Sequence, residues 1–324
     1  MITDVAGLLV GHHHRIGAGW ATGTTVVLTP EGATAAVDQR GGAPGTRETD
    51  VLEPENLVQR VHGISLSGGS AYGLAAADGV MRWLSERHHG FRVGAGPHEV
   101  VPIVPGAVIF DLPLNDWGNR PDASFGYAAC EAASGGPVEE GTVGAGAGAK
   151  AGSLKGGTGT ASEVVGGFTV GALAVVNAAG EAVEYETGLP HAADHGDFGV
   201  PWPNRPGTRP EHGATRLNTT IGVVAVDATL AKAECRRLAV AAQDGVARAV
   251  RPAHTMFDGD TVFALATGAE DLPGDEGPRA VALDALCSAA ARVFARAMVR
   301  GLLTAESAGG VPAYRDIWPE AYAD

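Results

Sequence analysis

The chain has 324 residues, 45% of them hydrophobic, and a formal net charge of −14, so it can bury one large core or two ordinary ones. Its acidic balance, without any run of Lys and Arg, argues against nucleic acid as a partner. No apolar run reaches the roughly 18 residues of a membrane span, and the N-terminus lacks the positive region of a signal peptide.

The first elements expected along the chain are two short strands, at residues 24–28 and 33–37, separated by a Pro-Glu-Gly turn at 30–32. His12, His13 and His14 precede them in a glycine-containing segment that we interpret as an early turn. Consecutive histidines point in different directions on a strand or a helix, so they do not predict a shared metal site.

A polar, glycine-rich segment follows at residues 38–50, and it fits either a solvated loop with internal ion pairs or a ligand-binding loop. Residues 62–90 predict a strand, a glycine turn and a helix. The turn resembles the G-x-S-x-G nucleophile elbow, but Tyr72 occupies the last position, so the pattern fails. We therefore interpret Ser70 as a helix cap.

A further apolar strand is expected within residues 101–112, and residues 142–162 form the most glycine-rich stretch. That stretch resembles a phosphate loop but lacks the GK[ST] sequence. Lys155 within it either places an ammonium near a reacting centre or is an ordinary surface lysine. Asn177 closes a clear strand at 168–176, where it is either a turn former or an amide that stabilises an oxyanion.

Residues 189–217 show no helical or strand period, which is unusual for so long a segment inside a compact chain. A strand is predicted directly after it, at 219–226, with small or apolar residues on both faces. At the junction, attack of the Thr219 hydroxyl on the Asn218 carbonyl would cut the chain and free an α-amine that serves as a general base. The alternative is that two threonines simply begin a strand.

The remaining chain predicts a helix at 228–250, a turn at Asp258-Gly259-Asp260 followed by a strand, a long helix at 279–302, and a polar tail. The two carboxylates of the turn either orient an α-ammonium or serve the turn itself. Strands and helices alternate, with several strands in succession. This order predicts an α/β sandwich whose sheets are covered by helices.

Several segments in this order resemble one known family: GHH, RGGAPGTRETD, LSGGSAYGLAAADGVM, VGAGAGAKAG, LKGGTGTAS, NTTIGVVAVDA and FDGDTVFAL. The chain is similar to the DmpA-type self-processing aminopeptidases, which include β-peptidyl aminopeptidases and nylon-oligomer hydrolases. The resemblance covers nearly the whole chain. It implies an αββα sandwich of the N-terminal-nucleophile type, shared with ornithine acetyltransferase. It also implies that one domain, residues 1–324, is cut into fragments 1–218 and 219–324 that stay associated.

The resemblance assigns a role to each matching residue. Thr219 would be the nucleophile and Asn218 the last residue of the first fragment. Asn177 would donate to the oxyanion, and Lys155 would lie beside the nucleophile. The amine of the nucleophile would be fixed by two acids, Asp258 and Asp260.

Two positions depart from the family pattern. Phe110 stands where relatives often have tyrosine, and Ala147 stands where they often have threonine, so substrate choice and rate are open. We expect an amide hydrolase acting on small peptides or amide oligomers, without metal or organic cofactor. The alternatives are an acyltransferase of the ornithine acetyltransferase type and an uncleaved small-molecule-binding protein.

The expected partners and location follow from the resemblance and the cysteines. A homo-oligomer, a tetramer or larger, is implied by the family. Three widely separated cysteines, Cys130, Cys235 and Cys287, predict reduced thiols in a cytoplasmic protein.

Overall fold

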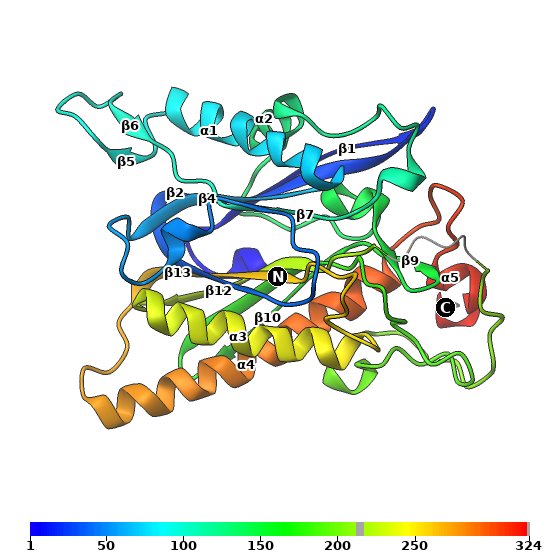
Figure 1. The fold of residues 1–324 in the computed structure, drawn as a ribbon. Helices are drawn as coiled ribbons and strands as arrows, with labels where there is room; N and C mark the ends of the chain where they lie inside the picture. Colours follow the sequence, from blue (N-terminus) through cyan, green and yellow to red (C-terminus); the bar gives the residue numbers. More distant parts are fainter. Residues whose placement is uncertain (212–216, 323–324) are drawn as a thin grey trace.

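Two β layers face each other and are enclosed by helices on both outer sides in the computed structural model (Figure 1). The structure describes residues 1–211 and 217–322. One layer contains β1, the first half of β2, β4, β7 and β3, which span Leu9–Gly17, Trp20–Gln39, Arg60–Ser67, Gly106–Val108 and Thr46–Arg47. The other contains the second half of β2 with β13, β12, β11 and β10, which span Thr261–Glu270, Ile221–Ala228, Phe168–Val175 and Thr158–Val165.

Strand β2 belongs to both layers, so the prediction of two short strands separated by a turn was wrong. Its first half pairs with β1 and β4, and from Thr34 to Gln39 it pairs with β13. The register with β4 shifts between Leu28 and Ala33, around the Pro-Glu-Gly segment. Because proline cannot donate a ladder hydrogen bond, this segment interrupts the pairing as an irregularity within one strand and does not reverse the chain.

Four main helices cover the outer faces. Helices α1 (Ala76–Glu86) and α2 (Ala123–Glu131) lie on the layer of β1, β2 and β4, and α3 (Lys232–Ala249) and α4 (Glu276–Leu303) lie on the other (Figure 1). The predicted helices at 228–250 and 279–302 are therefore confirmed within a few residues at each end. Helix α4 starts earlier than expected because Pro278 fits in the first helical turn, where no N–H bond is lost.

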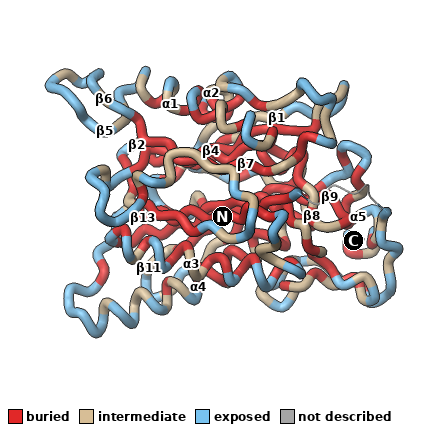
Figure 2. The backbone as a smooth tube through the Cα atoms, in the orientation of Figure 1, coloured by how far each residue is buried: buried red, intermediate tan, exposed pale blue. Residues whose placement is uncertain are grey.

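Three separate hydrophobic cores correspond to the three contacts between four layers. One core lies between α1, α2 and their strands and includes Val26, Val80 and Leu84. A second lies between the two β layers, and a third lies under α3 and α4. Buried backbone accordingly fills the middle of the molecule, while exposed segments lie at its ends (Figure 2). The predicted αββα sandwich is confirmed.

Strand β12 is buried on both faces, as its sequence predicts. Val223 and Ala225 pack into the core between the β layers, whereas Val224 and Val226 pack against α3 and α4. The strand runs parallel to β13 and antiparallel to β11, so it is central in its layer. It begins at Ile221, which leaves the two threonines at its entrance.

Other local predictions were wrong. The three consecutive histidines lie within strand β1 and not in a turn. Ser70 does not cap a helix: a short 3₁₀ helix, Ser70–Ala75, precedes α1, its N-cap is Gly69, and Ser70 itself has φ of 53°. The β-branched residues Val10 and Ile16 on either side of the histidines favour the pleated, half-buried position that β1 occupies beside β2.

The remaining elements are short. The strands β5, β6, β8 and β9 span Phe91–Arg92, Val100–Val101, Lys150–Ala151 and Leu154–Lys155. Helix α5 spans Tyr314–Ile317, and further 3₁₀ helices span Ile2–Asp4, Asp50–Leu52, Leu112–Leu114, Gly144–Gly148, Ala193–His195 and Pro319–Tyr322. The predicted irregular segment 189–217 contains little regular structure, and its residues 212–216 lie outside the described residues. Among the described residues, no helix combines the length and apolarity needed to cross a membrane.

Candidate active site

The Asn218–Thr219 junction lies buried at the entrance to β12. Both residues are 5% exposed. The Thr219 hydroxyl donates a hydrogen bond to the carbonyl oxygen of Asn218, so the nucleophile predicted from the sequence touches the peptide group it would attack. The Thr219 N–H donates to Asn177 O at 2.7 Å, and the Asn218 N–H donates to Phe257 O at 3.0 Å. The junction is thus held from both sides by backbone hydrogen bonds.

Asn177 follows β11 and contacts the junction through its backbone carbonyl. Its Oδ1 accepts a hydrogen bond from the Lys150 N–H at 2.8 Å. Its Nδ2 is buried and has no hydrogen-bond partner within the described part of the chain. An unsatisfied buried donor is rare and costs stability, so its presence suggests a group reserved for a ligand or an intermediate.

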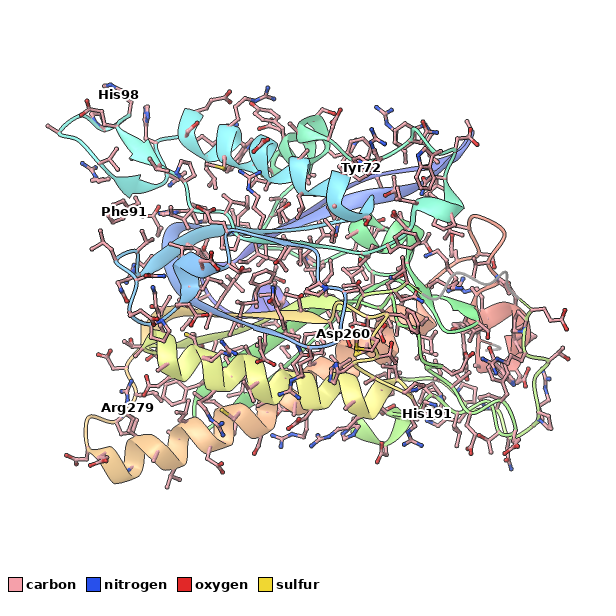
Figure 3. The ribbon with its side chains drawn as sticks, viewed as in Figure 1. Tyr72, Phe91, His98, His191, Asp260 and Arg279 are labelled. Carbon is pink, nitrogen blue, oxygen red and sulfur yellow. The ribbon has the colours of Figure 1, made fainter. Side chains whose placement is uncertain are left out.

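The two acids of the Asp-Gly-Asp turn brace this junction. Asp260 lies near the middle of the molecule (Figure 3), where it accepts from the Thr220 N–H at 2.8 Å and pairs with His254 Nδ1 at 2.7 Å. Asp258 accepts from the N–H of Ala179 at 3.0 Å. Burial raises the pKa of Asp260, and the neighbouring Asp258 adds to that shift.

These contacts refine the role expected for the acids. In the uncut chain Asp260 holds Thr220, the residue after Thr219, whereas Asp258 holds Ala179, two residues after Asn177. The Thr219 N–H itself donates to Asn177 O. Their action on a freed amine stays a prediction. His254 was missed by sequence reasoning, because a single histidine after proline carries no motif; only its approach to Asp260 reveals it.

Lys155 is fully buried, so the alternative of a surface lysine is excluded. Its Nζ donates to Gly146 O at 2.8 Å and Gly156 O at 2.7 Å. Burial lowers the pKa of Lys155 to about 7, while the charge of Asp111 opposes that shift. Lys155 pairs with Lys150 across the β8–β9 hairpin, and the Lys150 backbone bonds to Asn177. The hairpin therefore links Lys155 to Asn177, whose backbone carbonyl contacts Thr219.

Asp111 is a second buried group that the sequence analysis overlooked, although it follows Phe110 directly. Its carboxylate accepts from Thr22 Oγ1 at 2.6 Å and from the Gly69 N–H at 2.7 Å. Burial raises the pKa of Asp111 to about 6. A buried Asp and a buried Lys with pKa values moved towards each other are typical of functional sites.

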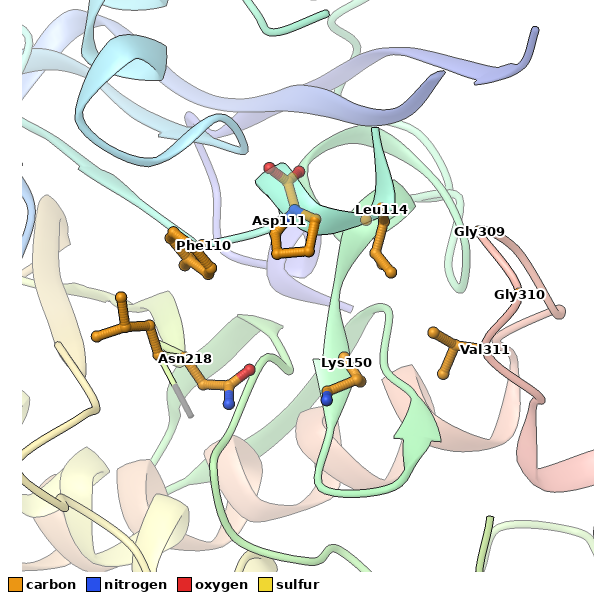
Figure 4. Close-up of a pocket in the computed structure, with 11 residues that line it drawn as sticks. Phe110, Asp111, Leu114, Lys150, Asn218, Gly309, Gly310 and Val311 are labelled. Atoms are coloured by element: carbon orange, nitrogen blue, oxygen red, sulfur yellow. The ribbon is translucent and has the colours of Figure 1, made fainter. Parts of the chain in front are cut away.

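Two cavities adjoin the junction and share a wall made by Phe110, Leu217 and Asn218. The first, of about 230 Å³, is shown in Figure 4. The second, of about 190 Å³, includes Thr219 itself. The first is lined by Phe110, Asp111, Pro113, Leu114, Gly148, Lys150, Leu217, Asn218, Gly309, Gly310 and Val311. The second is lined by Ala43, Pro44, Gly45, Ser70, Ala71, Val108, Ile109, Phe110, Leu217, Asn218, Thr219 and Phe257.

The loop at 38–50 carries ion pairs, whereas ligand binding by it stays a prediction. Arg40 pairs with Asp38 at 2.8 Å and Arg47 with Asp78 at 2.6 Å, so its charges are engaged in ion pairs. The loop also contributes residues 43–45 to the second cavity. Ala147 is fully buried in the 3₁₀ helix at Gly144–Gly148 and lines neither cavity.

The described residues include no cluster of three or more His, Cys, Asp and Glu side chains arranged to hold a metal ion. The site contains hydroxyl, amide, carboxylate and ammonium groups. Together these supply a nucleophile, a free donor for a developing negative charge, and buried groups that can hold or move protons.

An αββα sandwich with a buried hydroxyl, an amide donor and buried ionisable side chains has the groups that an amide hydrolase needs. The chain belongs to peptidase family S58, whose profile matches residues 1–314. It is 55% identical to an uncharacterized aminopeptidase of Mycobacterium tuberculosis (strain ATCC 25618 / H37Rv), over 99% of this chain and 98% of the relative.

Two further likenesses agree with the family. The chain is 32% identical to the 6-aminohexanoate-oligomer endohydrolase of Kocuria sp. (strain KY2), over 85% of this chain and 77% of that protein. The L-aminopeptidase D-Ala-esterase/amidase of Ochrobactrum anthropi, described as a variant of the Ntn hydrolase fold, matches with a TM-score of 0.74 and 26% identity. That match covers 96% of this chain and 88% of the other.

The protein is thus a hydrolase that acts on amide bonds. The family and its relatives support this function over the acyltransferase and the uncleaved binding protein that the sequence left as alternatives.

Proposed function

We propose that the protein cuts itself between Asn218 and Thr219 and then hydrolyses small peptides or amide oligomers with Thr219 as its N-terminal nucleophile. The observation that carries the proposal is the hydrogen bond from the Thr219 hydroxyl to the Asn218 carbonyl oxygen in a buried junction. A threonine that merely begins a strand does not need its hydroxyl to contact the preceding carbonyl in the wall of a cavity.

Self-cleavage proceeds by transfer of the acyl group. The Thr219 oxygen attacks the Asn218 carbonyl carbon, the C–N bond breaks, and the hydroxyl proton ends on the released nitrogen. Water then hydrolyses the ester, leaving a carboxylate on Asn218 and a free α-amine on Thr219. That amine has an ordinary pKa of roughly 7.7–8.0, so a useful fraction is neutral near physiological pH.

Turnover repeats the same chemistry on a substrate. The α-amine of Thr219 takes the hydroxyl proton as the oxygen attacks the substrate carbonyl, and later gives it to the leaving amine. The buried Nδ2 of Asn177 donates a hydrogen bond to the oxyanion, and this hydrogen bond is strongest in the transition state. Asp258 and Asp260 hold the backbone of Ala179 and Thr220. Lys155 binds backbone carbonyls of the glycine-rich segment.

The test compares Thr219→Ala with Thr220→Ala by intact mass under denaturing conditions and by hydrolysis of 4-nitroanilides. The wild type is expected as two fragments, the smaller beginning at Thr219, and Thr219→Ala as one uncut, inactive chain. Thr220→Ala changes the adjacent threonine without removing the nucleophile, and should still be cut. A cut or active Thr219→Ala protein would overturn the assignment.

The assembly and location are proposed from the family resemblance. After cleavage the fragments 1–218 and 219–324 stay together, because β12 and β13 of the second fragment pair with β11 and β2 of the first. We also infer a homo-oligomer, a tetramer or larger, in the cytoplasm. Light scattering of the cut protein tests the homo-oligomer, and a molar mass that corresponds to one copy of the chain would refute it.

A further inference from the structure

Lys150 contributes an ammonium group to the 230 Å³ cavity beside the junction (Figure 4). Its side chain is half-buried, and burial lowers its pKa. No hydrogen bond or ion pair joins its Nζ to another residue in the described ranges, unlike Lys155, whose Nζ is bonded to two carbonyls. A partly desolvated ammonium without a partner favours an anionic group that enters the cavity.

Two acidic groups near Lys150, Asp111 and Glu181, are already engaged in other hydrogen bonds or ion pairs. Asp111 also lines the cavity, but its carboxylate points away from Lys150 in Figure 4 and is bonded to Thr22 and Gly69. Glu181, the acid whose charge acts on Lys150, accepts hydrogen bonds from Ser153 and pairs with Arg209. Neither carboxylate therefore neutralises Lys150 at close range.

Apart from Lys150, Asp111 and Asn218, the cavity wall consists of apolar side chains and glycine backbone: Phe110, Pro113, Leu114, Gly148, Leu217, Gly309, Gly310 and Val311. The lining residues of the second cavity include no charged side chain. A single ammonium in these surroundings interacts more strongly with a carboxylate than it would in water. The whole chain carries a net charge of −14, so an anionic substrate needs such a local cation to bind.

Asn218 indicates which part of a substrate reaches Lys150. In the uncut chain Asn218 is the acyl residue of the bond that Thr219 attacks, and its side-chain amide points into the cavity towards Lys150 (Figure 4). A substrate attacked by the same hydroxyl places its own acyl group where Asn218 lies. The asparagine carboxamide carbon is separated from the reacting carbonyl carbon by two carbons, the spacing found in a succinyl or α-aspartyl group.

We propose that this cavity selects amides whose acyl group carries a carboxylate separated from the scissile carbonyl by two carbons. The ammonium of Lys150 holds this carboxylate. This substrate class rests on the proposed function of Thr219. Lys150 is a specificity-determining residue in this scheme and takes no part in the bond-breaking steps.

The test measures kcat and KM of the cut enzyme on succinyl-4-nitroanilide and on butyryl-4-nitroanilide, which has a similar acyl chain but no charge. The wild type is expected to prefer the succinyl compound. Lys150→Met should lower its kcat/KM by about 10- to 100-fold, mostly through KM, as expected for a lost charged hydrogen bond. The butyryl compound should be little affected, and Lys150→Arg should restore much of the preference.

Arg92→Met serves as the matched control, since it removes one positive charge at an exposed position on the short strand β5. Calorimetry of the wild type and Lys150→Met with the mono-amide of succinic acid gives a readout independent of turnover. Binding by the wild type alone supports the proposal.

Two failures are distinguishable. If wild-type hydrolysis depends on Thr219 but shows no succinyl preference, or if Lys150→Met leaves the succinyl-to-butyryl ratio unchanged, the pocket assignment is overturned and the proposed function stands. If Thr219→Ala retains hydrolysis, the proposed function fails. Absence of both succinyl turnover and mono-amide binding also overturns the pocket assignment.

Discussion

Replacing Asn177 tests the oxyanion donor at the centre of the mechanism. Asn177→Asp removes the buried Nδ2 donor but keeps an oxygen to accept the Lys150 N–H, now bonded at 2.8 Å. Because Nδ2 has no partner among the described residues, its loss breaks no hydrogen bond of the resting protein. The cost should appear in the transition state, as a fall in kcat with KM nearly unchanged.

The expected magnitude follows from removal of one donor to an oxyanion, which costs about 2.7–4 kcal/mol, or a kcat lower by roughly 10²–10³. Self-cleavage, which builds the same charge on the Asn218 carbonyl oxygen, should slow as well. The assay is 4-nitroanilide hydrolysis, normalised to the cut fraction that intact mass reports. This normalisation separates slow maturation from slow turnover.

Two comparison variants isolate the donor. Asn177→Ala also lacks Nδ2, and should lose a similar factor in kcat while losing stability as well, since the Lys150 N–H then has no acceptor. A large loss in the Asp variant alone would point to its added charge. Asn119→Asp is the control for replacing an asparagine amide by a carboxylate. In the wild type the Asn119 amide donates to Gly19 O at 2.9 Å. A kcat within about threefold of wild type in both Asn177 variants would refute oxyanion donation.

Three further predictions concern neighbouring groups. Asp260→Ala removes the acceptor of the Thr220 N–H and should slow self-cleavage at least about tenfold in a mass time course, whereas unchanged cleavage would exclude bracing. Phe110→Tyr adds a hydroxyl at a wall shared by both cavities; a higher kcat is expected, and an unchanged kcat would show that this hydroxyl is not needed. Burial raises the pKa of Asp111 to about 6 from 3.8, so the folded chain retains a proton that the unfolded chain releases, and this contribution to stability is lost as pH rises through about 6. The Tm of Asp111→Asn relative to wild type should therefore increase between about pH 4 and about pH 7, and a flat difference would contradict the shift.

The fold could be predicted where the hydrophobic pattern of the sequence agrees with the packing of the side chains. The residues of β12 alternate between two buried faces, and both faces meet a core as expected. The Pro-Glu-Gly segment in β2 was mistaken for a turn, because turn residues have the same local signature whether they reverse a chain or interrupt its pairing. Only the partner strands β4 and β13, distant in sequence, decide between the two.

The candidate site was predictable mainly through its motifs, and less so where distant segments meet. Asn218 and Thr219 are adjacent in the sequence. Asn177 lies beside them because its backbone carbonyl accepts a hydrogen bond from the Thr219 N–H. Lys150 lies within the VGAGAGAKAG segment but received no role from it, and its importance comes from the β8–β9 hairpin. His254 belongs to no motif, and its importance comes from its contact with Asp260. Such contacts between segments are what composition and periodicity leave undetermined.

The buried polar groups around Thr219 argue that this region serves chemistry and not stability. Asp111 and Lys155 are desolvated enough that burial moves both pKa values towards neutrality, and Asn177 leaves a donor unsatisfied. Well-packed apolar residues of similar size would often cost less than a buried charged pair. The strand beside them, β12, has such residues on both faces. A chain that fills its centre with valine and alanine yet keeps these groups buried supports the proposed reaction at Thr219.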